Sequence, residues 1–440
     1  MDGYGSRHLP SAGHHDPLSV RAVAFDDGRA QALLIVCDVI GVDSVLTAGV
    51  RQRLQEGLGV APDLVMLAAT HTHSGPAGVR ISAHPLDASL RATLADTIVA
   101  CAEEALTKLQ PVRLAYGQAT VTGLNQNRRD PSAATPARLD VLVCHGEDEL
   151  PVAIVVGFAC HPTVLDHGNL HYSADYPGAV VTALEAALPG AVATFVAGAC
   201  AEVNPARSAP TFTEVARFGR VLGGAALRLV GELGALDAPR YVDNLRWDER
   251  LEVAQPTGRS LRMALRGVRR SVDLPLKAFA SAETYEVRIA ALRRELDQAG
   301  PGSTDERRRR MPELAALAAE HASRPVAAIY RERYGEHVSA ELHLLPVAYD
   351  LALLAFPGEA FSTYDRFARE RWPGDLLIAA YTNDYVGYLV TTDCLATGGY
   401  EAGRTLYGPG QQAAVEAAVT ALLGPPDDRA SARREWRRYA

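Results

Sequence analysis

The chain has 440 residues, of which 48% are hydrophobic and 22% are charged. This composition is typical of a folded globular protein and excludes a disordered or fibrous one. The formal net charge is −8, so the surface has no general attraction for a phosphate backbone, and we expect no nucleic acid partner.

The sequence also bears on membranes and compartment. No run approaches the roughly 20 apolar residues of a membrane-spanning helix, and the opening segment MDGYGSRHLPSAGHHDP lacks the apolar stretch of a secretory signal. The six cysteines are scattered without CxxC spacing, which favours reduced thiols over a disulfide framework. We therefore expect a cytoplasmic protein without a transmembrane segment, which can form a homo-oligomer.

Strand-like and helix-like patterns alternate over the first two thirds of the chain. Nearly continuous apolar runs predict strands that are buried on both faces, and apolar residues at helical spacing predict amphipathic helices. The predicted strands are 32–42, 64–72, 112–121, 139–144, 152–160 and 192–199, and the predicted helices are 44–58, 90–109 and 213–233. This order predicts an α/β fold with a large mixed β-sheet core flanked by helices on both faces.

The pattern changes after residue 236. Residues 237–280 mix short β-like pieces with basic sequence, and residues 281–334 are rich in Ala, Glu, Arg and Leu around one Gly-Pro-Gly break. We expect 281–334 to form a helical subdomain inserted into a single domain that spans 1–425. Strands are predicted at 340–355 and 376–381, a helix at 411–423, and a basic tail at 426–440.

Two histidines follow the second predicted strand directly. His71 and His73 flank a threonine and precede Ser-Gly-Pro, which does not continue a strand. In an extended chain these side chains share a face, and the ends of strands are where α/β sheets form their binding crevice. The pattern indicates a metal site; the alternative is a pair of histidines that hydrogen-bond the turn.

The same arrangement recurs twice. His161 ends an apolar run and precedes a proline, and Glu359 follows an apolar run and a Pro-Gly turn. Zinc binds imidazole and carboxylate groups from distant segments of a chain. For Glu359 alone, a structural role at a helix N-terminus is the alternative. Tyrosines concentrate at 381–388 and again at Tyr400, in a Gly-rich stretch that favours a site wall over core packing.

Several short motifs then resemble one known family. They are HTHSGP (71–76), NQNRR (125–129), FACHPT (158–163), the segment ending VNP (203–205), PGEAFS (357–362), the tyrosine block ending GY (387–388) and YEAGRTLYGP (400–409). In this order, and across most of the chain, they resemble the neutral ceramidase family. Collinear agreement of this kind is far more specific than any single motif.

The resemblance implies a zinc-dependent hydrolase that cleaves an N-acyl amide bond by attack of a zinc-bound hydroxide, built on a large α/β domain. The positions that match the family's zinc ligands are His71, His161, Glu359 and Tyr388. The positions that match its catalytic residues are His73, Arg128 and Tyr400. One Zn²⁺ per chain is expected.

The chain departs from the family at two places. Ceramidases carry a serine in a GDVSPN-like motif, whereas here the stretch reads AEVNP (201–205), with Asn204 at the position of the serine. An amide is not a nucleophile, so we expect Asn204 to bind substrate. The tyrosine block also differs from the family pattern by one inserted residue. This leaves Tyr385 as the alternative to Tyr388 for the position of the zinc-binding tyrosine.

The expected substrate is a small soluble N-acyl amide, because neither the immunoglobulin-like C-terminal domain nor the secretory signal of ceramidases is evident in the sequence. Membrane ceramide is the less favoured substrate. Two alternatives stay open: hydrolysis of an ester, lactone or other acyl group at the same site, and a non-catalytic relative that binds a ligand.

Overall fold

The structure is a computed structural model that describes residues 1–77, 87–234, 241–243, 250–252, 259–299 and 304–424. The predicted basic tail at 426–440 lies outside the described residues. The mixed α/β class is confirmed, but one large sheet was the wrong expectation. The described strands form three main sheets, of five, four and three strands, with several two-stranded ones.

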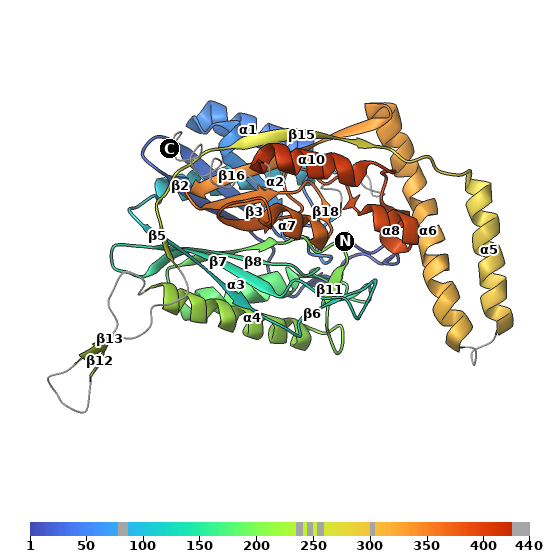
Figure 1. Cartoon of the computed structure of the whole chain (residues 1–440), viewed down its shortest axis with the longest axis horizontal. Coiled ribbons are helices and arrows are strands. Elements are labelled where there is room, and N and C mark those ends of the chain that lie inside the picture. Colours follow the sequence, from blue (N-terminus) through green and yellow to red (C-terminus); the bar gives the residue numbers. More distant parts are fainter. Residues whose placement is uncertain (78–86, 235–240, 244–249, 253–258, 300–303, 425–440) are drawn as a thin grey trace.

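The five-stranded sheet makes up the first layer of the core. Its order is β10-β8-β7-β5-β14, with β10 and β8 parallel and the other pairs antiparallel. Helices α3 (Asp175–Ala187) and α4 (Phe212–Leu233) cover its outer face (Figure 1). The strand bounds are Val192–Ala197, Pro151–Phe158, Arg138–His145, Arg113–Thr120 and Arg259–Leu261, in the order of the sheet.

The second layer contains the other two main sheets. One is β2-β3-β4 and the other β15-β16-β17-β19, and Ala68 of β4 joins them through an isolated bridge to Thr382, just after β19. Helices α1 (Ser44–Leu58), α2 (Ala88–Thr107) and α10 (Gln411–Leu423) lie on the outer side (Figure 1). The strand bounds are Val20–Asp26, Gln31–Cys37, Val65–Ala69, Val268–Pro275, His337–Ala348, Leu351–Ala355 and Asp375–Ala379.

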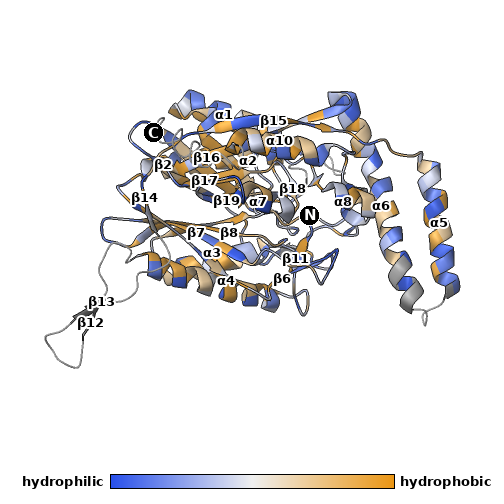
Figure 2. Ribbon diagram, viewed as in Figure 1, coloured by the Kyte–Doolittle hydropathy of each residue, from blue (hydrophilic) through white to orange (hydrophobic). Residues whose placement is uncertain are grey.

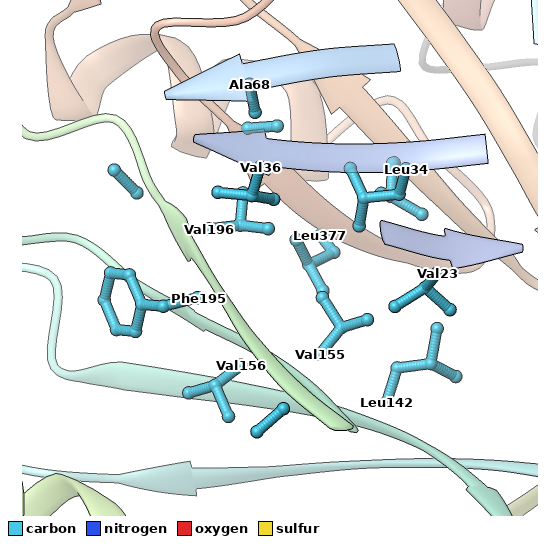
Figure 3. Packing of buried hydrophobic residues seen from close by; sticks show 14 of the residues in the cluster. Val23, Leu34, Val36, Ala68, Leu142, Val155, Val156, Phe195, Val196 and Leu377 are labelled. Atoms are coloured by element: carbon cyan, nitrogen blue, oxygen red, sulfur yellow. The ribbon is translucent and has the colours of Figure 1, made fainter. Parts of the chain in front are cut away.

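The main hydrophobic core fills the space between the two layers. Figure 3 shows Val36 and Ala68 of the second layer above Val155 and Val196 of the first. A strand packed between a helix and a second sheet is as apolar as one packed between two helices. The apolar runs therefore predicted buried strands correctly but did not distinguish one sheet from two stacked layers.

Local sequence explains how the helices begin and how they pack. The Asp43 carboxylate caps α1 by accepting a hydrogen bond from the Leu46 amide at 2.9 Å. Helices α3 and α4 lie close together because small residues face each other. A Cβ on Gly219 would lie 2.6 Å from the Cβ of Ala179, so only glycine permits this approach.

Residues 281–334 contain two helices, α5 (Ala282–Ala299) and α6 (Thr304–Tyr334), which lie side by side at one end of the molecule (Figure 1). Helix α6 packs against α9 (Tyr400–Arg404) and β16. Figure 2 shows that the central strands are predominantly hydrophobic, whereas α5 mixes hydrophilic and hydrophobic residues. Among the described helices, none combines the length and hydrophobicity that crossing a lipid bilayer requires.

The remaining elements are short. The predicted strand at 340–355 is in fact two strands, β16 and β17, because a turn at 349–350 reverses the chain. The short elements are β1 (Gly13–His14), η1 (Pro62–Leu64), β6 (Asn125–Asn127), β9 (His171–Tyr172), β11 (Val203–Pro205), β12 (Tyr241–Asp243), β13 (Arg250–Glu252), β18 (Glu359–Ala360), α7 (Ser362–Arg369), β20 (Tyr388–Leu389) and α8 (Thr392–Thr397).

Candidate metal centre and adjoining cavity

His71 and His73 meet in the turn that follows β4, with their Nε2 atoms 3.1 Å apart. The strand ends at Ala69, and His71 adopts a left-handed backbone conformation with φ of 65°. The two rings therefore converge through a strained turn and not through the alternation of an extended strand. Such strain is most often found at functional sites. Hydrogen bonding fixes the His71 ring, since its Nδ1 lies 2.6 Å from the Ile40 carbonyl oxygen.

His161 approaches from the other layer of the core. It follows β8, and its Nδ1 lies 2.8 Å from the Cys200 carbonyl oxygen. The ring centroids of His161 and His71 are 5.1 Å apart. Because Nδ1 of each ring must carry a proton to donate to its carbonyl, Nε2 of each neutral ring presents a lone pair toward the centre.

Glu359 completes this convergence. It lies in β18, which pairs in parallel with β20, and its Oε2 is 3.2 Å from Nε2 of His161 and 3.9 Å from Nε2 of His71. A carboxylate oxygen and two imidazole lone pairs thus face one another inside the protein. Acceptors alone repel, so a proton or a metal cation must lie among them. This donor set fits zinc.

The pKa values show how the protein balances these charges without a metal. Burial alone would raise the pKa of Glu359, but the hydrogen bond from His161 and the nearby His71 hold it well below its usual range. Burial alone would lower the pKa of His161, but Cys200 and Glu359 raise it to about 9. The His161 ring therefore carries the balancing proton at neutral pH.

The ligand nitrogens of His71, His73 and His161 all lie within 4.8 Å of one another and could hold a metal ion. His73 differs from the other two because its buried Nδ1 has no hydrogen-bond partner among the described residues. Burial, followed by the charges on His71 and His161, lowers the pKa of His73 well below its usual value. The His73 ring is therefore neutral at neutral pH in the metal-free protein.

Arg128 stands beside the centre, on the segment after β6, and is held from three sides. Its Nε donates to Glu401 at 2.7 Å, its Nη1 to Asn204 at 3.2 Å, and its Nη2 to the Tyr388 hydroxyl at 3.0 Å. Burial would lower the pKa of Arg128, but Tyr388 and Glu401 raise it well above its usual value. Sequence reasoning missed Glu401, although it directly follows Tyr400 in a motif that had been singled out.

The tyrosines occupy distinct positions. Tyr385 donates a hydrogen bond to Glu359, whereas the Tyr388 hydroxyl lies against Arg128. Tyr381, which had no assigned role, stacks on His71 with ring centroids 3.8 Å apart. Tyr400 is 44% exposed and its ring centroid is 6.1 Å from that of Tyr388. The structure thus places one phenol at the carboxylate and another at the guanidinium.

A cavity of about 450 Å³ opens next to these residues. Of the predicted site residues, His73, Arg128, Asn204, Tyr388 and Tyr400 line it directly. His71, His161 and Glu359 lie behind His73 and are almost fully buried. The remaining lining residues are Gly3, Tyr4, Gln126, Thr163, Pro205 and Arg207.

The sequence is similar to those of known proteins. Residues 1–213 match the family model described as neutral/alkaline non-lysosomal ceramidase, N-terminal. The chain is 28% identical over 240 residues to a neutral ceramidase of Mycobacterium tuberculosis, a match that covers 48% of this chain and 37% of that protein. It is 33% identical over 138 residues to a neutral ceramidase of Pseudomonas aeruginosa, which covers 29% of this chain and 21% of that protein. These matches thus span less than two fifths of either relative.

Solved structures extend the likeness of fold to nearly the whole chain. The crystal structure of the Pseudomonas aeruginosa neutral ceramidase superposes with a TM-score of 0.72 at 22% identity, covering 99% of this chain and 72% of that one. The solved structure of a ceramidase complexed with C2 superposes with a TM-score of 0.70 at 20% identity, covering 96% of this chain and 72% of that one. The first 213 residues thus match the neutral/alkaline non-lysosomal ceramidase family model, and the fold of nearly the whole chain is similar to that of a solved neutral ceramidase.

Proposed function

We propose that this protein is a zinc-dependent hydrolase that cleaves the amide bond of a small N-acyl substrate. The observation that carries the proposal is the meeting of three acceptors, from His71, His161 and Glu359, beside a cavity. These three residues would hold the zinc ion. Tyr388 is proposed as the fourth ligand, and Tyr385, which already donates to Glu359, is the alternative.

Zinc bound there would supply Lewis acidity, which polarises an acyl carbonyl and lowers the pKa of a water molecule. The protein's own groups have separate tasks. His73, kept neutral by burial, accepts a proton at Nδ1 or Nε2 and returns it to the departing amine. The Tyr400 hydroxyl and the Arg128 guanidinium line the cavity and stabilise negative charge on the carbonyl oxygen, each by about 3 kcal/mol.

Asn204 acts as a binding residue in this scheme. Its Oδ1 accepts a hydrogen bond from Arg128, which fixes the side-chain amide and leaves its Nδ2 hydrogens for a substrate oxygen. The cavity of about 450 Å³ falls within the range of small-molecule sites, which supports a compact substrate over a long-chain lipid.

The metal part of the proposal is tested by elemental analysis of the full chain after zinc reconstitution and desalting. We expect one zinc per chain in the wild type and in His337→Ala, a control at an exposed histidine. His161→Ala and Glu359→Gln should lose stoichiometric zinc while keeping most of the fold. Stoichiometric zinc in both would remove these residues from the ligand set. Comparing Tyr388→Phe with Tyr385→Phe shows which phenol contributes to zinc affinity.

The catalytic part is tested with paired N-acyl amides and esters of equal acyl length. Faster release of amine than of alcohol, relative to the uncatalysed rates, supports amide hydrolysis, and the reverse supports the ester alternative. A protein that binds zinc but hydrolyses neither series would be a ligand-binding relative. Asn204→Ala should retain zinc and lose about ten- to a hundred-fold in kcat/KM, the effect of one hydrogen bond to developing charge.

A further inference from the structure

Arg207 is a lining residue of the cavity with no role in the proposed chemistry. It follows β11 in a loop that is tied to the body by the hydrogen bond from the Ala206 amide to the Leu124 carbonyl, at 2.8 Å. Its Nη1 donates to two backbone carbonyls, those of Thr163 and Val164, the second at 2.8 Å. The guanidinium is thus anchored to the segment directly after His161.

This anchoring uses only one of the three nitrogens of the Arg207 guanidinium. Among the described residues, neither Nε nor Nη2 of Arg207 has a hydrogen-bond acceptor, and Arg207 forms no ion pair. The nearby carboxylate of Asp175 accepts instead from the backbone amides of Val164, Leu165 and Tyr176. The Nε–Nη2 edge of an arginine is the planar pair of donors that matches a carboxylate.

The charge around the cavity points the same way. Two arginines, Arg128 and Arg207, line the cavity, and no carboxylate is among the lining residues that the structure describes. Glu401 is shared, since it accepts from Arg128 at 2.7 Å and from Arg129 at 2.6 Å. A cavity lined by two arginines and by no carboxylate among the described residues favours anionic ligands.

We propose that Arg207 recognises a carboxylate on the substrate, so that the preferred substrate is an N-acyl amide with an anionic group, such as an N-acyl amino acid. This inference rests on the proposed function, since it concerns the substrate of the same site. Arg207 is a specificity-determining residue here: it binds a part of the substrate that does not react. A neutral substrate of the same shape leaves the Nε and Nη2 donors of Arg207 unpaired.

The test compares N-hexanoylglycine with N-hexanoylglycinamide, which differ only in the charge of the terminal group. A second pair, N-methyladipamate and N-methylhexanamide, carries the carboxylate on the acyl side. In at least one pair, we expect the wild type to prefer the carboxylate by about ten- to a hundred-fold in kcat/KM, mainly through KM. Arg207→Gln should reduce this ratio to near one, and Arg207→Lys should give an intermediate value.

The ratio of kcat/KM between the two members of a pair separates recognition of the carboxylate from a structural effect of the substitution. If Arg207→Gln merely loosened the segment after His161, both members of a pair would slow equally and the ratio would persist, which overturns the proposal. Arg220→Gln, at an exposed arginine of α4, is the matched control and should keep the wild-type ratio. A wild-type ratio near one in both pairs also overturns it.

Failure of the proposed hydrolase function can be distinguished from failure of the proposed carboxylate site. If no amide is hydrolysed, the hydrolase proposal fails, and isothermal titration calorimetry with the same pairs then tests Arg207 by binding alone. Tighter binding of the carboxylate, lost in Arg207→Gln, upholds the carboxylate site as a ligand site, and equal binding of both members of each pair refutes it.

Discussion

Zinc binding should expel a proton from His161. In the metal-free protein the pKa of this ring is raised to about 9, because Cys200 and Glu359 outweigh the effect of burial. Below that pH the ring is an imidazolium that donates to Glu359, and it must become neutral before it binds a metal. About one proton per zinc should therefore leave near pH 7.5, and release should decline as the pH rises through about 9.

Because a proton and the zinc ion compete for the His161 ring, the apparent zinc affinity should depend on pH. At pH 7, about two pH units below the His161 pKa, apparent zinc affinity should be about a hundredfold weaker than above pH 9. Isothermal titration calorimetry in buffers of different ionisation enthalpy counts the released protons. In the metal-free protein, Glu359→Gln removes the anionic acceptor, so the pKa of His161 should fall, which NMR titration of the ring measures without zinc. A binding enthalpy that does not depend on the buffer at pH 7.5 would refute this reasoning.

Two further predictions concern packing around the site and in the fold. Glu401→Gln leaves Arg128 and its neighbour without their buried carboxylate, which is 2% exposed; we expect a loss of about 3 kcal/mol in unfolding free energy, measured by denaturant titration. Gly219→Ala places a Cβ 2.6 Å from the Cβ of Ala179 and should cost about 1–3 kcal/mol. Gly224→Ala, on the same helix with open space at its Cβ, should instead gain about 0.5–1 kcal/mol. Equal effects in the two glycine variants would contradict the close packing of α3 and α4.

Local sequence was sufficient for the features that depend on neighbours along the chain. The predicted helices at 44–58 and 411–423 agree with the structure, because helical spacing acts within a few residues. Histidines placed after apolar runs were likewise found by position alone. His71 illustrates the limit, since it meets His73 through a left-handed turn that strand alternation does not describe.

Contacts between distant segments were out of reach of the same reasoning. Nothing in the spacing of residues indicates that Glu401 pairs with Arg128, 273 positions away, or that Tyr385, and not Tyr388, donates to Glu359. The second layer of sheets was missed for the same reason. The apolar pattern of a strand is a local property of the sequence, whereas the helix or sheet that covers the strand depends on the fold of the whole chain.

The arrangement of the metal centre has a consequence for biosynthesis. His71 and His161 emerge from the ribosome early, but Glu359 is made 198 residues after His161. A nascent chain can therefore present imidazoles long before it has the counter-charge that holds a dication in place. For the proposed zinc site, secure uptake of the ion would await the last third of translation. An ion bound then would link segments from both halves of the polypeptide and so disfavour their separation.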